Sequence, residues 1–170
     1  TIYYSINGGD YQKYTEPLIQ NEACTINAYC TAENLMDSPI MTYDFDLYIN
    51  KSAWKLVSVD SQHSGNEARL AFDGKNDTFW HTEWGSVEPS CPHTIVIDMA
   101  TEYKVTAITY LSRQDGNQNG MVKNFEVYLS NDGSTWGSPV VSGQFKNTTS
   151  QQVAKLTIPT TSRYLKFVAK

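Results

Sequence analysis

The fold class is decided by the stretch Asn124-Phe125-Glu126-Val127-Tyr128-Leu129-Ser130, which is followed directly by Asn131-Asp132-Gly133. Its apolar residues, Phe125, Val127 and Leu129, alternate with polar ones, as in a strand with one buried face and one hydrated face. Asp-Gly pairs tolerate a positive φ and favour tight corners. The stretch therefore predicts a half-buried strand that ends in a hairpin turn.

Similar short runs recur along the chain, and no stretch keeps the 3.6-residue rhythm of an amphipathic helix for long. The expected strands are Ile2 to Ile6, Thr94 to Met99, Lys104 to Leu111, Asn124 to Ser130 and Arg163 to Ala169. Many short strands between turn residues predict an all-β sandwich or barrel.

A domain boundary is expected near Asn50. Residues 1–50 form a Tyr-rich β segment, and the strand-like run Trp54 to Val59 opens a second segment, residues 51–170. Because about 50 residues are too few for a stable sandwich, the first segment is expected to be part of a neighbouring module.

The charge balance excludes some partners. The chain has 13 Lys and Arg against 18 Asp and Glu, for a formal net charge of −5. Nucleic acids and anionic membranes bind clustered Lys and Arg, so neither is expected as a partner. Nor does any apolar run reach the ~18 residues needed to span a bilayer.

The three cysteines are expected to be free thiols. Cys24 and Cys30 lie in one extended run, which separates their α-carbons by roughly 20 Å, whereas a disulfide needs about 4.4–6.8 Å. Cys91 has no obvious partner.

Two stretches carry chemistry. Ala71 to Trp84 is a polar loop followed by an aromatic run with a histidine, and Tyr110 to Gly120 is a strand end followed by an arginine and several amides. A sugar site needs planar polar groups for the hydroxyls and a flat ring for the apolar face of the sugar. Both stretches supply this mixture.

At these motifs residues 54–170 resemble the discoidin-like, coagulation-factor C-type fold, in the branch of family 32 carbohydrate-binding modules. They are similar to the galactose-binding domain of galactose oxidase. The similarity lies in Ala71-Phe72-Asp73-Gly74, Trp80-His81-Thr82, Pro92-His93-Thr94-Ile95 and Arg113-Gln114-Asp115-Gly116-Asn117-Gln118-Asn119-Gly120. The resemblance implies a jelly-roll β-sandwich and a non-catalytic role.

The resemblance also implies a sugar site at one end of the sandwich, made by Glu67, His81, Trp84, Arg113 and Asn119. His81 and Arg113 are expected to donate hydrogen bonds, Glu67 and Asn119 to hold neighbouring hydroxyls, and Trp84 to supply an apolar edge.

Structural alternatives stay open for these residues. Arg113 next to Asp115 could form a surface ion pair, His81 could be a structural group, and Trp84 could belong to the core. Glu67 could point several ways. Trp54, Trp80 and Trp136 are expected in the core.

The loop from Leu70 to Thr78 suggests a calcium site, because hard cations prefer carboxylate, carbonyl and hydroxyl oxygens. In relatives this loop holds a structural Ca²⁺. The matching ligands are the Leu70 and Lys75 carbonyls, the Asp73 carboxylate, and the carbonyl and hydroxyl of Thr78. Relatives add a glutamate from a strand after the one that contains Ala169. A metal-free turn is the alternative.

The first segment is similar to the small immunoglobulin-like β-sandwich that follows the catalytic barrel in chitobiases and β-N-acetylhexosaminidases, through Tyr3-Tyr4-Ser5-Ile6-Asn7-Gly8 and Tyr14-Thr15-Glu16-Pro17. The chain is thus expected to contain part of that sandwich, followed by the discoidin-like jelly roll.

The implied function is a carbohydrate-binding module that holds a covalently linked upstream glycoside hydrolase near glycans with terminal galactose, GalNAc or GlcNAc. We expect a monomer that is secreted, periplasmic or at the cell surface. The alternative is a discoidin-type adhesion or protein-interaction domain, and no motif of a catalytic site is present.

Overall fold

The computed structural model describes residues 1–20, 24–45 and 48–170, which form two compact units, Thr1–Ile49 and Asn50–Lys170. In the described residues the regular elements are nine strands and one 3-10 helix. The all-β prediction is confirmed. None of the described residues forms a helix of the length and apolar character that crossing a membrane requires.

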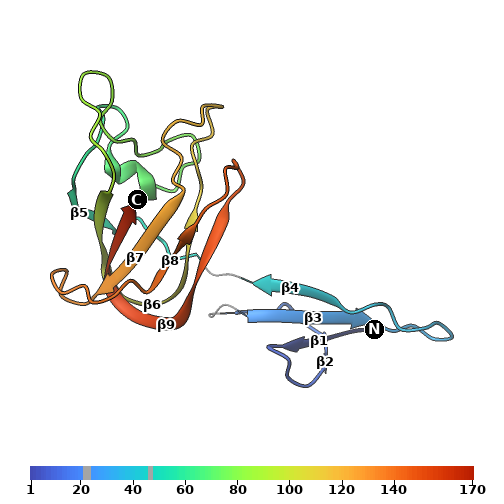
Figure 1. Cartoon of the computed structure of the whole chain (residues 1–170). Helices are drawn as coiled ribbons and strands as arrows, with labels where there is room; N and C mark the ends of the chain where they lie inside the picture. The colour runs from blue at the N-terminus through green and yellow to red at the C-terminus, as the bar shows by residue number, and fades with distance from the viewer. Residues whose placement is uncertain (21–23, 46–47) are drawn as a thin grey trace. The chain divides into compact units, whose positions relative to one another are not determined.

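Unit Thr1–Ile49 is a four-stranded antiparallel sheet in the order β2-β1-β3-β4 (Figure 1). The corner between its first two strands is made by Asn7 and Gly8, both with positive φ (52° and 75°), as a tight hairpin requires. The strands are β1 (Ile2–Ile6), β2 (Gln12–Lys13), β3 (Cys24–Cys30) and β4 (Met41–Phe45).

The first and last residues of β3 are Cys24 and Cys30. Because the strand between them is extended, they cannot pair with each other. Both residues, and Cys91, are free thiols, as expected from the sequence.

Unit Asn50–Lys170 contains a five-stranded antiparallel sheet in the order β5-β6-β9-β7-β8. Its elements are β5 (Lys55–Val59), the 3-10 helix η1 (Ala68–Phe72), β6 (His93–Tyr110), β7 (Asn124–Ser130), β8 (Val141–Gln144) and β9 (Gln152–Ala169). The predicted strands Thr94 to Met99 and Lys104 to Leu111 are two halves of β6.

Strands β6 and β9 pair along both halves and bend together. The register of the pair shifts between Asp98 and Tyr103, and Ala100 has a φ of 70° within this bend. Such bulges sharpen the bend of a strand. Figure 1 shows the two long strands curving at the base of the unit, which closes the sheet into the sandwich expected for a discoidin-like jelly roll.

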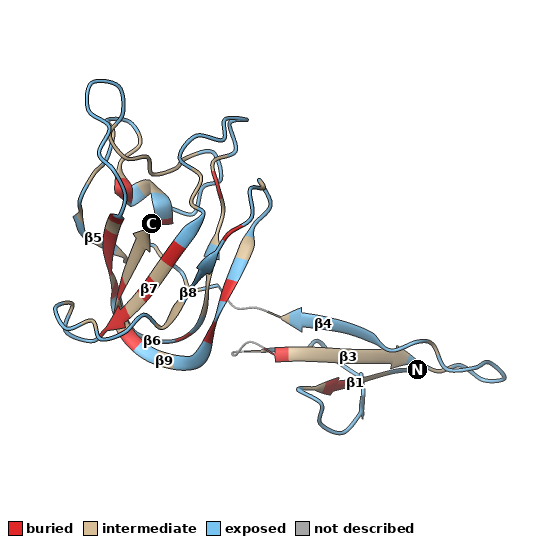
Figure 2. Ribbon diagram, viewed as in Figure 1, coloured by how far each residue is buried: buried red, intermediate tan, exposed pale blue. Residues whose placement is uncertain are grey.

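The core lies between the curved layers (Figure 2). The alternating residues of β7 enter it as predicted: Phe125, Val127 and Leu129 are all buried. The buried cluster consists of Ala68, Phe72, Ile95, Ile97, Met99, Val105, Phe125, Val127, Leu129, Phe145, Ala154, Leu156 and Leu165.

Two of the three tryptophans expected in the core are packed against it, Trp54 and Trp80. The third expectation is wrong. Trp136 is only half-buried, and its ring faces the Lys166 ammonium at 4.7 Å, outside the buried cluster. Trp136 follows the turn at Asp132. On the outward side of β9 near this turn, its ring meets the side chain of Lys166 rather than apolar side chains.

Because β6 and β9 bend, both ends of each strand lie at the same end of the unit. Backbone and side-chain bonds join the loops there: Phe145 N donates to Lys123 O (2.8 Å), and Ser112 Oγ donates to Thr148 O (2.9 Å). The loops of residues 60–92, 111–123 and 145–151 therefore gather at one end, and the loop of residues 131–140 lies at the other.

Candidate functional site

The base of the site is a short backbone ladder between two segments of the loop of residues 60–92. His63 N donates to His81 O at 2.8 Å, and His81 N donates to Asn66 O at 3.0 Å. The indole of Trp80, the next residue back, donates to Ser61 O at 2.9 Å. This ladder fixes the backbone of His81 although its partners are 15 and 18 residues away in sequence.

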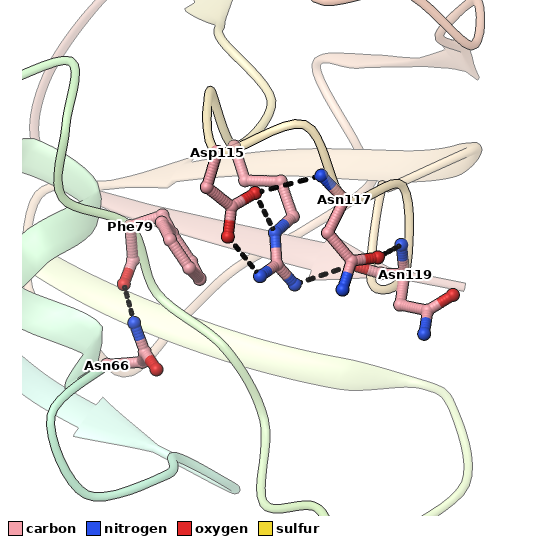
Figure 3. Close-up of polar contacts among 6 residues, drawn as sticks. Asn66, Phe79, Asp115, Asn117 and Asn119 are labelled. Atoms are coloured by element: carbon pink, nitrogen blue, oxygen red, sulfur yellow. Dashed lines mark hydrogen bonds and ion pairs between the residues drawn. The ribbon is translucent and has the colours of Figure 1, made fainter.

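Arg113 is held on three sides (Figure 3). Its Nε donates to Asp115 Oδ1 at 2.8 Å, and its second edge nitrogen donates to Asp115 Oδ2. The remaining terminal nitrogen donates to Asn119 O at 3.1 Å, and the guanidinium lies 4.5 Å from the centre of the Phe79 ring. The ion pair between Arg113 and Asp115, which the sequence presented as the alternative to a role in binding, is therefore present in the structure. It lies within the predicted site.

His81 meets the same loop at Gly120. A Cβ built on Gly120 would lie 2.8 Å from His81 Nε2, and Gly120 has a φ of 79°. Only glycine fits this close approach in the left-handed region. His81 and Arg113 thus both lie against residues 119–120, His81 at Gly120 and Arg113 at the Asn119 carbonyl, at the same end of the unit.

The contact of the His81 ring with its neighbour defines which nitrogen carries the proton when the ring is neutral. His81 Nδ1 lies 2.8 Å from Thr82 O, and a carbonyl can only accept, so Nδ1 carries the proton. In the neutral ring Nε2 is then an acceptor. A sugar hydroxyl would donate to His81 rather than accept from it.

Trp84 is on the surface, not in the core. Its side chain is 52% exposed, and its ring stacks on His63 at 4.5 Å between centroids. Glu83 Oε1 accepts from His63 Nδ1 (2.8 Å) and Trp84 N (3.1 Å). The hydrogen bond from His63 holds the pKa of Glu83 below its usual range. One face of a supported indole is thus available for stacking.

The side chains of Glu67 and Asn119 are less directly involved in the contacts of the predicted site. The Glu67 carboxylate accepts from Gly65 N at 3.1 Å, which lowers its pKa, and lies 4.0 Å from Arg69. Asn119 supports Arg113 through its backbone carbonyl, and in Figure 3 its amide points away from the guanidinium. The described contacts bring His81, Arg113 and Asn119 together, whereas the Glu67 carboxylate is engaged with its own turn.

Sequence reasoning missed the supporting residues of this site. They are Phe79 under Arg113, Asn66 and His63 beside His81, and Glu83 beside Trp84. Only Phe79 had a local signal, as an aromatic residue two positions before the predicted histidine. The others act through pairing between distant segments.

The loop expected to hold calcium contains a carboxylate and a hydroxyl in contact. Asp73 Oδ2 accepts from Thr78 Oγ1 at 2.7 Å, and Asp73 Oδ1 accepts from Lys75 N at 2.9 Å. Burial raises the pKa of Asp73, but these hydrogen bonds outweigh it and leave the pKa below its usual value. Two of the expected oxygen donors are therefore adjacent, and the anionic form of Asp73 is favoured. To that extent the loop fits a hard cation.

Comparison with known proteins concerns the second unit. Residues 55–170 match the family model for the F5/8 type C domain. Galactose oxidase of Gibberella zeae is 48% identical over 123 residues, which cover 71% of this chain and 18% of that protein. The chain thus spans less than a fifth of the length of this relative.

The chain is also similar to two solved structures, each a domain of a larger protein or a binding module. The C-terminal domain of a chitobiase from Bacteroides fragilis superposes with a TM-score of 0.65 at 30% identity, over 71% of this chain and 83% of that one. A family 32 carbohydrate-binding module of Clostridium perfringens, in complex with GalNAc-β-1,3-galactose, superposes with a TM-score of 0.61 at 32% identity, over 68% and 83%.

Proposed function

The chain belongs, through residues 55–170, to the F5/8 type C domain family, and from this premise we propose that it binds terminal galactose, GalNAc or GlcNAc at the loops of His81 and Arg113. This unit is a binding module, not an enzyme, in keeping with the non-catalytic modules that it resembles in structure. The module keeps a linked glycoside hydrolase near its glycan substrate.

The convergence of His81 and Arg113 carries this proposal. Three of the five N–H groups of Arg113 are used in the described bonds, so two are left to donate to hydroxyls. His81 Nε2 accepts from a neighbouring hydroxyl. Trp84 stacks against the apolar face of the sugar. Donor, acceptor and platform together match the chemistry of one hexose.

A site of this kind is weak. Few hydrogen bonds and one ring predict a dissociation constant on the order of 0.1 to a few mM. Attachment to an enzyme makes such affinity useful, because the tether raises the effective concentration of glycan. The similarity to the chitobiase domain supports a chitobiase-like host, and glycans of this kind imply a secreted, periplasmic or cell-surface location.

A glycan array followed by titration tests the function. The chain is applied to an array, and methyl glycosides of galactose, GalNAc and GlcNAc are then titrated while chemical shifts of the histidine and tryptophan side chains are followed. We expect saturation in the millimolar range with shifts at His81 and Trp84. No binding to any of the three sugars contradicts the proposal, and binding to anionic liposomes or to a protein partner alone favours the adhesion alternative.

We propose a structural Ca²⁺ at the Leu70–Thr78 loop as a second part of the function, held by the Asp73 carboxylate, the Thr78 hydroxyl and the carbonyls of Leu70, Lys75 and Thr78. The ion would replace the Thr78-to-Asp73 hydrogen bond and tie the loop that leads into Trp80 and His81. At a hundredfold excess over its dissociation constant, calcium would add about 2.7 kcal/mol to the free energy of unfolding.

Calcium removal tests this assignment. Thermal unfolding is followed with 2 mM CaCl₂ (a concentration of about this size suffices for extracellular modules) and with EGTA, for the wild type and Asp73→Ala. We expect calcium to raise the midpoint of the wild type only. Equal midpoints of the wild type with calcium and with chelator contradict a bound ion.

A further inference from the structure

We propose that Asp115 is the positioning residue of the sugar site and the residue that makes it select neutral over anionic sugars. This inference rests on the proposed sugar-binding function. It concerns a side chain for which the sequence suggested only a surface ion pair.

Hydrogen bonds within the loop of residues 111–123, named the Arg113 loop from here on, form a closed ring (Figure 3). Asp115 Oδ1 accepts from Arg113 Nε (2.8 Å) and from Asn117 N (3.2 Å). Asn117 Oδ1 accepts from Asn119 N (2.9 Å), and Asn119 O accepts from Arg113 (3.1 Å). Each member is therefore fixed by the next, and Asp115 is the member that contacts Arg113 with both carboxylate oxygens.

The wall under Arg113 completes the positioning. Phe79 stacks against the guanidinium, and the Phe79 carbonyl accepts from Asn66 Nδ2 at 3.5 Å. Between this ring and the Asp115 fork, the Arg113 side chain is left only 14% exposed. A long, flexible arginine normally loses about 2 kcal/mol of rotamer entropy when it is ordered. Here that cost is met on folding, before a sugar arrives.

The Asp115 fork also balances the charge of Arg113. A bidentate carboxylate–guanidinium pair has no net charge, but the guanidinium keeps N–H groups on its other edge. The hydrogen bond with Arg113 lowers the pKa of Asp115 to about 2, so the pair stays ionised in neutral solution. Two carboxylates of the loop of residues 60–92, Glu67 and Glu83, add negative charge at the same end of the unit. Hydroxyls can use these N–H groups, whereas a carboxylate or sulfate meets a cation already paired.

Three variants separate charge from positioning. Asp115→Asn removes the charge and weakens the fork, and Asn117→Ala opens the ring without a change of charge. Asp132→Asn removes an aspartate of the same turn type, whose Oδ1 accepts from Ser134 N at 2.8 Å, at the other end of β7. Each is titrated with the methyl glycosides of galactose, GalNAc and GlcNAc and with their 3-O- and 6-O-sulfated forms, at 20 and 300 mM NaCl.

The wild type is expected to bind a neutral glycoside, and its sulfated form at least tenfold more weakly. Asp115→Asn should weaken neutral binding by about tenfold and tighten sulfated binding, with an affinity that falls as salt rises. Asn117→Ala should weaken both forms by about threefold without a change of preference. Asp132→Asn should behave as the wild type.

Thermal midpoints and shifts of the core methyl groups verify that each variant is folded. If Asp115→Asn keeps the wild-type affinity and the wild-type preference, the proposed role of Asp115 is wrong while the sugar site stands. If Asn117→Ala also gains sulfated binding, loop mobility rather than charge sets the preference, and the selectivity proposal is overturned. Failure of the wild type to bind any neutral glycoside overturns the sugar-binding function itself, together with this inference.

Discussion

The loops at the two ends of β7 use the same turn chemistry for different purposes. The Arg113 loop (residues 111–123) precedes Asn124, and the Asp132 loop (residues 131–140) follows Ser130. Each has an Asp-Gly pair in which the aspartate accepts the backbone N–H two residues on: Asp115 from Asn117 (3.2 Å), and Asp132 from Ser134 (2.8 Å). In each, the glycine has a positive φ.

The difference lies in what else the carboxylate binds. Asp132 Oδ1 accepts from Ser130 Oγ, Ser134 N and Thr135 N, all within its own turn. Asp115 instead holds both edge nitrogens of Arg113. The Asp132 carboxylate bonds only to groups of its own turn, so that turn serves as a corner of the fold. The Asp115 carboxylate holds Arg113 against the Phe79 ring, so that turn presents the N–H groups of Arg113 to a ligand. The same short motif therefore predicts a turn in both places but a site in only one.

The largest effect is expected from removal of the cation itself. Arg113→Ala should weaken sugar binding by about ten- to a hundredfold, because hydrogen bonds to a charged group are worth about 1.5–3 kcal/mol. The matched control is Arg163→Ala, since Arg163 makes a similar fork with Asp98 (Nε to Oδ1, 2.8 Å) near the Asp132 loop. It should lower the thermal midpoint and leave sugar affinity unchanged. Unchanged binding by Arg113→Ala, measured by titration, refutes the site.

A glycine pair tests the contact between the Arg113 loop and His81. Gly120→Ala and Gly116→Ala both place a side chain at positive φ (79° and 83°), which costs about 1–2 kcal/mol of stability. Only the Cβ at position 120 meets His81, at 2.8 Å from Nε2, whereas nothing lies within 4 Å at position 116. Thermal midpoints should fall in both variants, but sugar affinity should fall several-fold only in Gly120→Ala. Equal affinities would mean that His81 does not contact the sugar.

The two half-exposed tryptophans form the next comparison. Trp84→Ala removes the indole that stacks on His63 and should weaken binding by about three- to tenfold, since an aromatic contact is worth about 0.5–1.5 kcal/mol. Trp136→Ala removes an indole that faces Lys166 at the other end of β7 and should affect stability alone. The check is titration together with thermal unfolding. If Trp136→Ala loses sugar binding, the sugar site lies at the end of the Asp132 loop, and its assignment to the end with His81 and Arg113 is wrong.

Local patterns were enough to predict the strands of the fold. The alternation in Phe125, Val127 and Leu129 places these residues in the core, because a period of two leaves no other arrangement on a one-sided sheet. The continuity of β6 could not be predicted, since Ala100 and the register shift near it depend on pairing with β9. The core position expected for Trp136 was wrong for the same reason, because Lys166 covers that side of the sheet.

The residues of the candidate sugar site were predicted through the resemblance to family 32 carbohydrate-binding modules. The residues that support them were not predicted. His81 and Arg113 lie in recognisable blocks, but their proximity depends on His63 and Asn66 pairing with His81 across the loop. Asp115 was a foreseeable ion-pair partner, two residues from Arg113. The sequence presented ion pair and ligand site as alternatives, whereas the structure has the pair within the predicted site. Pairing of this kind is a tertiary property, so spacing along the chain could not distinguish it from a surface contact.

The smallest expected effect is in acid. The pKa of Asp115 is lowered to about 2 by its bonds with Arg113, and that of Asp132 is lowered by the N–H groups of its own turn, whereas a free aspartate titrates at about 3.9. For a carboxylate with a depressed pKa, the stabilisation is complete above the unfolded-state pKa and disappears as the pH falls through the folded-state pKa. Both aspartates should therefore add to the loss of stability between pH of about 4 and 2, each by a small amount because both are exposed.

Sugar binding should separate the two aspartates over the same range. Protonated Asp115 resembles asparagine, so the ratio of wild-type to Asp115→Asn affinity should stay constant from pH 7 to about 4 and approach one as the pH falls toward 2. The corresponding ratio for Asp132→Asn should be one throughout, because that carboxylate acts only on its own turn. Titrations at pH 7, 5, 4, 3 and 2 measure both ratios, with thermal unfolding to verify that the chain is folded at each pH. If the Asp115 ratio is already one at neutral pH, the carboxylate stabilises its loop as Asp132 does, and the difference between the two ends of β7 is only the presence of an arginine.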